Sequence, residues 1–182
     1  MSQDEIIKSA KEKGFQNASF IDASKILFDE GFRKNCEMNS CGNYGRNYAC
    51  PPNAGEAGAL IAKARKYRQA LVFQSISPLE DSYDYEGMMD AQKKHAKAAR
   101  SLWEEWKAEL GPSLLLSAGE CQICAKCGMI DGVPCRFPDK AVSSLEAYCI
   151  DVSQLAPVSH MKYINGTNTV TYFGAVLFDP AD

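Results

Sequence analysis

Seven of the eight cysteines of this chain fall into two short segments, and this grouping constrains the fold more than any other feature. The segment CEMNSCGNYGRNYACPP, residues 36–52, places Cys36, Cys41 and Cys50 in a C-x4-C-x8-C pattern. The segment GECQICAKCGMIDGVPC, residues 119–135, has a C-x2-C-x2-C-x7-C pattern formed by Cys121, Cys124, Cys127 and Cys135. Glycines, asparagines and prolines between the cysteines favour loops. Any fold of this chain has to accommodate two thiol-rich loops.

The surroundings of these thiols decide whether they form disulfides. The N-terminal segment MSQDEIIKSAKEKGF is polar and amphipathic, unlike a secretory signal, and no apolar run is long enough to span a bilayer. These features predict a cytoplasmic protein, in which thiols stay reduced and clustered cysteines bind metal or take part in redox chemistry. The net charge of −3 favours neither nucleic acid nor an anionic membrane, so we expect neither partner.

The second segment has the more specific spacing. Three thiols at every third residue allow one compact loop to direct them inward around a cubane cluster, and bacterial ferredoxins begin with the same C-x2-C-x2-C run. A single tetrahedral zinc is more often held by two separated C-x2-C pairs. The gap before Cys135 is longer than in ferredoxins, and Pro138 follows only three residues later. We therefore predict a four-thiolate [4Fe-4S] site suited to electron transfer, with zinc as the alternative cofactor.

The first segment supplies only three thiols. Three thiolates can anchor a cubane and leave one iron without a protein thiolate, and such an open iron could bind a substrate as a Lewis acid. Alternatively, Cys149 or one of the two histidines, His95 and His160, completes the set, or one cluster is shared between both loops. His95 is otherwise expected to be a partly exposed residue of a long helix.

The two segments, together with the sequence SAGECQICAKCGMIDGVPCRFPDKAVSSLEAYCIDV around the second, resemble the DUF2284 family of predicted metal-binding proteins. The resemblance covers about a third of the chain by motif and context. It implies metal binding, with iron–sulfur clusters as the usual cofactor, but no particular reaction. The family pattern has a glycine where this chain has Cys149, which makes Cys149 a less secure ligand than the other seven cysteines.

Hydrophobic periodicity predicts the remaining architecture. Helices are expected over residues 3–13, 55–67, 85–110 and, with Ser144 as N-cap, 143–150, and strands within 18–28, 70–76, 113–118 and 167–178. This order predicts an α+β (or α/β) fold, in which a single domain over residues 1–182 packs a mixed sheet against helices and carries two cysteine-rich metal-binding loops.

Two functions follow from these patterns. The first is an iron–sulfur protein with two [4Fe-4S] clusters that acts in redox chemistry or electron transfer, as an enzyme or as a carrier that meets a redox partner protein. The second is a zinc-stabilised binding module without catalytic turnover. The sequence names no substrate and no oligomeric state.

Overall fold

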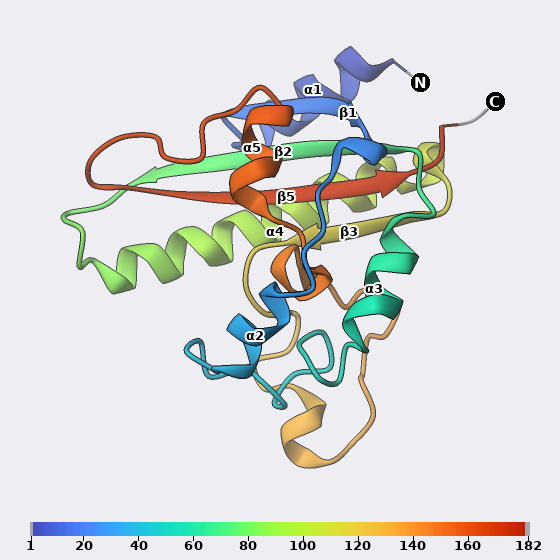
Figure 1. The fold of residues 1–182 in the computed structure, drawn as a ribbon. Helices are drawn as coiled ribbons and strands as arrows, with labels where there is room; N and C mark the ends of the chain where they lie inside the picture. Colours follow the sequence, from blue (N-terminus) through green and yellow to red (C-terminus); the bar gives the residue numbers. More distant parts are fainter. Residues whose placement is uncertain (1, 181–182) are drawn as a thin grey trace.

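The two longest strands, β2 (Gln69–Pro78) and β5 (Thr169–Phe178), form the centre of a five-stranded sheet (Figure 1). The structure is a computed structural model that describes residues 2–180. β2 and β5 pair antiparallel over their whole length, from Gln69 opposite Phe178 to Pro78 opposite Thr169. β1 (Asn17–Asp22) extends the sheet beyond β2, and β3 (Ser113–Ser117) pairs antiparallel with β5. The short β4 (Ser143–Ser144) runs parallel to β3, so the sheet is mixed, in the order β1-β2-β5-β3-β4.

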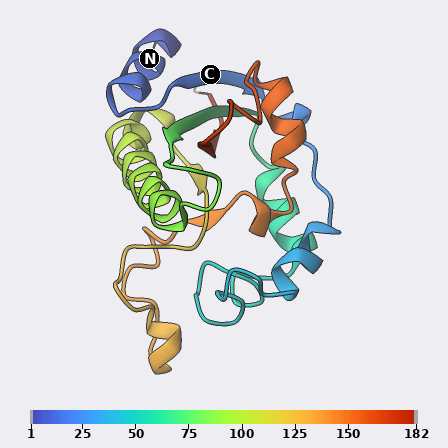
Figure 2. The same ribbon diagram turned by 90° about the vertical axis from the view of Figure 1, so that its left-hand side faces the viewer.

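The side chains of β2 alternate between two hydrophobic cores, because successive residues of a strand point to opposite faces. Ala70 and Val72 belong to one core, together with residues of α3 (Ala57–Ala64) and α5 (Val152–Val158). Leu71 and Phe73 belong to the other, together with residues of α1 (Gln3–Glu12) and α4 (Tyr85–Leu110). Figure 2 shows the resulting layers, with α1 and α4 on one side of the sheet and α3 and α5 on the other. The fold is α+β, as predicted.

The helix α4 begins and ends at the residues that the sequence predicts. The side chain of Asp84 accepts a hydrogen bond of 2.8 Å from the backbone N–H of Gly87 and caps the N-terminus. Gly111 ends the helix with a φ of +68°, a conformation that glycine adopts without strain. The buried residues of α4 lie on the stripe that packs against the sheet: Ala91, His95, Ala96, Ala99, Leu102 and Leu110.

One segment differs from the predictions. Residues 143–150 form β4 and the short 3₁₀ helix η3 (Glu146–Tyr148) rather than an α-helix, although the Ser144 hydroxyl does accept a 3.0 Å hydrogen bond from the N–H of Ala147. Pairing of β4 with β3 overrides the local pattern there. Residues 18–28 contain one strand, β1, which is followed by the 3₁₀ helix η1 (Ala23–Lys25) and by an isolated bridge from Phe28 to Ile150.

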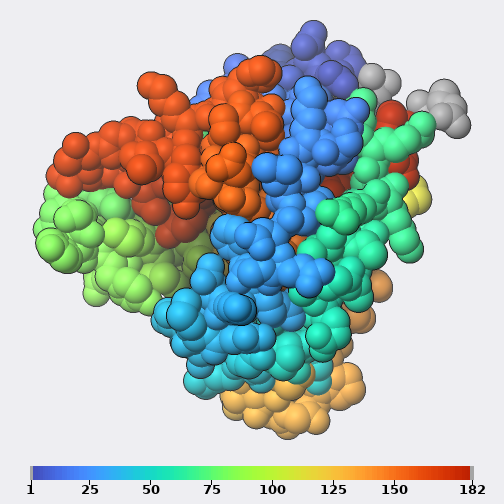
Figure 3. Space-filling model, in the orientation of Figure 1, coloured from blue at the N-terminus to red at the C-terminus, as the bar shows by residue number. Residues whose placement is uncertain are grey.

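The two cysteine loops project together from one end of the domain. Figure 1 shows residues 36–52 and 119–140 at the lower end, while α1 and the end of β5 lie at the upper end. In the space-filling view of Figure 3, the two segments contact each other and form that end of the molecule. Within residues 2–180, no helix combines the length and the apolar character needed to cross a membrane.

Candidate metal centre

The first cysteine loop starts in a short helix and continues through tight turns. Cys36 lies in the last turn of α2 (Phe32–Glu37), and its carbonyl accepts a 3.0 Å hydrogen bond from the N–H of Asn39. Gly42 and Gly45 have φ values of +76° and +72°, which an L-residue adopts only with strain. The N–H of Gly45 donates to the Pro51 carbonyl at 2.9 Å and closes the loop. These turns fold the three thiols back toward one another.

The second loop leaves the sheet directly from β3. Cys121 follows the end of this buried strand by four residues, so the first thiol of the loop is tied to the rigid core. The loop then forms the 3₁₀ helix η2 (Gly128–Asp131), and the N–H of Val133 donates back to the Gly128 carbonyl at 3.0 Å. A Cβ atom at Gly128 would lie 2.9 Å from the carbonyl oxygens of Val133 and Pro134. Only glycine therefore allows the two arms of this loop to approach so closely.

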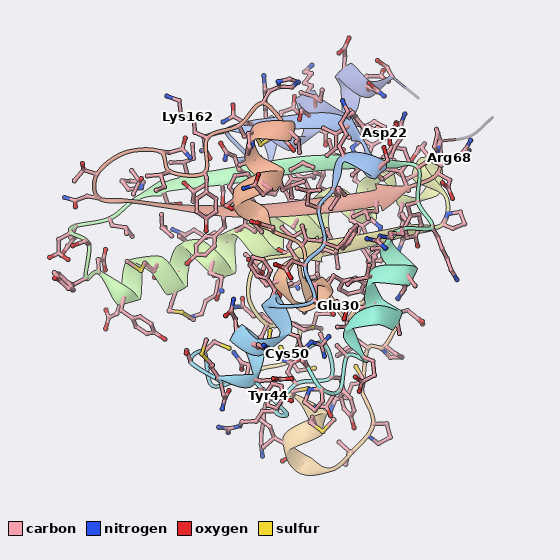
Figure 4. The ribbon with its side chains drawn as sticks, viewed as in Figure 1. Asp22, Glu30, Tyr44, Cys50, Arg68 and Lys162 are labelled. Atoms are coloured by element: carbon pink, nitrogen blue, oxygen red, sulfur yellow. The ribbon has the colours of Figure 1, made fainter. Side chains whose placement is uncertain are left out.

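Hydrogen bonds join the two loops. The side-chain amide of Asn47, which is buried, donates to the Cys121 carbonyl at 3.2 Å, and the Tyr48 hydroxyl donates to the Val133 carbonyl at 2.8 Å. A longer contact of 3.4 Å links the Asn43 amide to the Glu120 carboxylate. Figure 4 shows the labelled Tyr44 and Cys50 within the same end of the molecule as the second loop. Segments separated by about seventy residues in the sequence thus form one lobe, the cysteine lobe.

Within this lobe the four cysteines of the second segment border one small cavity of about 20 Å³. Cys121, Cys124, Cys127 and Cys135 all contribute to its wall, together with apolar side chains that include Ile123 and Phe137. Residues Asn47 to Ala49 of the first loop close another side of it. That these four cysteines hold one cofactor stays a prediction.

The three thiols of the first segment are also neighbours. Burial is the main cause that raises the pKa of Cys50 to about 12, and negative charge on Cys41, Glu120, Cys36 and Cys121 raises it further. The pKa of Cys36 is likewise raised by burial, while the Arg33 guanidinium opposes that effect and Cys41 adds to it. Thiolates so placed repel one another, and a bound metal cation reverses this balance because it deprotonates the thiols that coordinate it.

All eight cysteines lie within residues 2–180, and every one of them is a free thiol. In the same part of the chain, no three Cys, His, Asp or Glu side chains gather closely enough to hold one metal ion between them. The structure therefore brings the seven predicted ligands into one lobe without closing any three of them around a single point. The donor set is purely sulfur, which suits zinc, copper(I) or iron–sulfur clusters rather than magnesium or calcium.

Cys149 lies next to the first set but outside it. It is fully buried, and its charge contributes to the raised pKa of Cys36. Arg33 stands beside both thiols, and its guanidinium donates to the carbonyls of Gly55 at 2.9 Å and Ala147 at 3.3 Å. Cys149 has a φ of +59°, in the left-handed region that favours glycine. A glycine would adopt this backbone conformation without strain.

The two histidines lie elsewhere. His95 is only 2% exposed, so the expectation of a partly exposed residue is wrong. Its Nδ1 is 2.7 Å from the Ser75 hydroxyl, and its ring contacts those of Phe15, Phe73 and Tyr172. His160 is an exposed residue just beyond α5, whose N–H donates to the Pro157 carbonyl at 3.0 Å. None of these contacts involves a cysteine, so the geometry gives no support to a histidine ligand in the first set.

Replacement of Cys149 tests whether its thiol is a metal ligand and whether its left-handed backbone conformation is strained. We expect Cys149→Gly to keep its metal and to change the free energy of unfolding by less than about 1 kcal/mol, because relief of the left-handed strain offsets the lost thiol packing. Metal content and the thermal midpoint measure both effects. Cys50→Ser, as the matched control in the first loop, is expected to lose metal. Loss of metal from Cys149→Gly would instead make Cys149 the fourth ligand.

The fold is that of an α+β protein that carries two cysteine-rich loops side by side at one end. Comparison with protein families agrees: residues 19–178 match the family described as "Predicted metal-binding protein (DUF2284)". The chain belongs to this family, which makes metal binding the shared property and leaves the metal open. Searches among curated proteins and among solved structures found no match.

Sequence reasoning did not find the residues that hold the lobe together. Asn47 and Arg33 act through hydrogen bonds to carbonyls that lie more than twenty residues away, and no local pattern announces such contacts. The one available signal was the unusual density of asparagine in the first segment, since asparagine side chains often satisfy backbone groups in irregular loops.

Proposed function

We propose that this protein is an iron–sulfur protein that holds two [4Fe-4S] clusters in the cysteine lobe and acts in electron transfer or redox chemistry. The observation that carries the proposal is the cavity lined by all four thiols of the C-x2-C-x2-C-x7-C segment. That spacing is typical of cubane ligation, whereas a structural zinc more often uses two separated pairs. Cys121, Cys124, Cys127 and Cys135 would hold one cluster, and Cys36, Cys41 and Cys50 the other.

The residues around the four cysteines of the second segment suit an iron–sulfur cluster. The apolar side chains of Ile123, Phe137 and Ala141 line the cavity beside the cysteines. An apolar shell and the exclusion of solvent are among the features through which proteins tune reduction potentials. When bound, an iron–sulfur cluster supplies one-electron transfer. The Tyr48 hydroxyl fixes one arm of the loop through the Val133 carbonyl and so helps to keep the thiols in place.

The compartment and the partner belong to the same proposal. Free thiols in all eight cysteines are consistent with a reducing, cytoplasmic environment. The lobe projects from the domain, and Ile130, Val133 and Phe137 of the second loop are exposed at 44%, 38% and 44%. A redox partner protein could therefore approach the second site directly.

The alternative is a zinc-stabilised module without turnover. An all-sulfur set of four cysteines is also the donor set of many structural zinc sites, which is the observation in its favour. The two candidates differ in colour and in metal content, so one preparation distinguishes them.

The test is a metal analysis of protein purified without oxygen. We expect a brown protein with broad visible absorption, iron and acid-labile sulfide in equal amounts, and an electron paramagnetic resonance signal after reduction. Cys124→Ser, which removes one thiol of the second set, is expected to lose about half of the iron if two cubanes are present. Cys149→Gly serves as the matched cysteine variant and is expected to keep it. A colourless protein with stoichiometric zinc would refute the proposal in favour of the structural module.

A further inference from the structure

A second cavity adjoins the cysteine lobe, and its wall is charged rather than apolar. It has a volume of about 520 Å³ and lies between α4, the first loop and the second loop. Figure 2 shows α4 above the second loop on the same side of the sheet. The thiol-bearing residues Cys121, Cys124 and Cys127 form part of its wall. This volume falls within the range of about 300–1,000 Å³ that is usual for small-molecule sites.

The wall of this cleft is strongly basic. Three cations come from α4 at positions i, i+4 and i+7 of one helical stripe, namely Lys93, Lys97 and Arg100. Arg46 faces them from the first loop and Lys126 from the second. The single acidic residue in the wall is Glu120, whose carboxylate is hydrogen-bonded to the amides of Asn43 and Gln122 at 3.4 Å each rather than to a cation.

Most of this positive charge is uncompensated. Lys126 pairs with Asp131, and Lys93 lies 3.8 Å from Asp90. Over residues 2–180, Arg46, Lys97 and Arg100 form no ion pair. Cations that converge on a concave site without acidic partners raise the local concentration of anions and bind phosphate or carboxylate groups by charge-assisted hydrogen bonds.

We propose that this cleft binds a small organic molecule with at least two phosphate or carboxylate groups, and that it holds this molecule against the second cysteine loop. The alternative explanation is that the cations only offset the negative charge of a thiolate-bound cluster. Lys97 and Arg100 argue against that explanation, because they belong to helix α4 rather than to either cysteine loop. Binding in the cleft deepens the proposed function by giving its substrate class, but it does not depend on which metal the thiols hold.

Isothermal titration calorimetry of the protein purified without oxygen tests the proposal. The probes are fructose bisphosphate and tricarballylate, with uncharged fructose as the control ligand. The double variant Lys97→Gln/Arg100→Gln removes two cleft charges. The matched variant Lys94→Gln/Lys66→Gln removes two exposed charges that lie outside the cleft and so keeps the net charge equal. Arg46→Gln, in the first cysteine loop, provides a second variant in case the helix variant is unstable.

We expect at least one anionic probe to bind the wild type, to bind more weakly at high salt, and to lose about tenfold or more in affinity in the double variant. The matched variant should bind as the wild type does. Binding of the bisphosphate alone, of the tricarboxylate alone, or of both would identify the chemistry of the anionic groups. Absence of binding at millimolar concentration, or equal binding by wild type and both cleft variants, would overturn the proposal.

Metal content and visible absorption, measured on the same samples, report on the proposed function independently. A colourless zinc protein that still binds an anion through Lys97 and Arg100 would refute the iron–sulfur proposal and leave the cleft in place. A brown iron–sulfur protein that binds neither probe would support the iron–sulfur proposal and overturn the proposed anion site.

Discussion

Removal of the metal is expected to unfold both cysteine loops while the five-stranded sheet remains folded. Of the residues that the structure describes, none between Cys36 and Asn53, and none between Gly119 and Ala141, belongs to either hydrophobic core. The loops are held by turns and by a few hydrogen bonds, such as those of Asn47 and Tyr48 to the second loop. Metal coordination contributes roughly 10–16 kcal/mol to the folding of small metal domains, so a metal held by these loops would dominate their stability.

Hydrogen–deuterium exchange measures this effect segment by segment. After chelation and oxidation, the amides of residues 36–53 and 119–141 should exchange orders of magnitude faster, as in locally unfolded regions. Amides of β2 and β5 should keep their protection, because both strands are paired along their whole length inside the sheet. Loss of protection in β2 and β5 would show that the metal stabilises the entire domain, and unchanged loops would show that their hydrogen bonds suffice.

Acidification is expected to destabilise the protein through His95. Burial lowers the pKa of this histidine from 6.5 to about 4, with a smaller opposing effect from the Phe173 backbone. The unfolded state therefore binds more protons than the folded state between these two values, and stability falls as the pH falls through this window. The depression of the pKa corresponds to about 3 kcal/mol, which is fully present above pH 6.5 and lost progressively toward pH 4.

The surroundings of His95 explain why protonation is costly. Its Nε2 is buried without a hydrogen-bond partner within residues 2–180, and its Nδ1 contacts the Ser75 hydroxyl. The cations Lys13 and Lys94 line the adjoining cavity, and Tyr172, whose pKa is raised by burial, stays neutral over this range. No carboxylate faces the ring in this cavity. A positive imidazolium would therefore have neither solvent nor a counter-charge.

Thermal midpoints of the wild type, His95→Gln and His160→Gln between neutral pH and pH 4 test this prediction. His95→Gln should be less stable at neutral pH, because it loses the contact with Ser75, but it should lose less stability on acidification. His160 is exposed, so His160→Gln should follow the wild type. Because thiolate ligands also protonate in acid, the difference between wild type and His95→Gln is the informative quantity. An identical pH dependence in these two proteins would contradict the prediction.

The sequence predicted those elements whose patterns are long and local. The bounds of α4 follow from its apolar stripe and from Gly111, and β2 and β5 follow from runs of branched and aromatic residues. The helix α5 was not predicted, although Asp151 caps it by accepting from the N–H of Ser153 at 3.0 Å. Pro157 lies inside this seven-residue helix and obscures its periodicity.

The site was predictable in part for a similar reason. The spacing of the cysteines places each set in one compact loop, but within residues 2–180 the structure gathers no three of them around one point. The contact between the two loops depends on Asn47 and Tyr48, and the basic cleft depends on the position of α4 over the lobe. Both arise only from tertiary packing. In the sequence alone, the stripe of Lys93, Lys97 and Arg100 does not differ from an ordinary solvent-exposed helix face.

The placement of the cysteine lobe has a practical consequence. Because α1 and the end of β5 lie at the end of the domain away from the lobe (Figure 1), a fluorescent label attached to α1 or beside Phe178 would sit remote from the thiols. Surface immobilisation through such a label would then present the cysteine loops outward, toward an electrode or a docking molecule in solution.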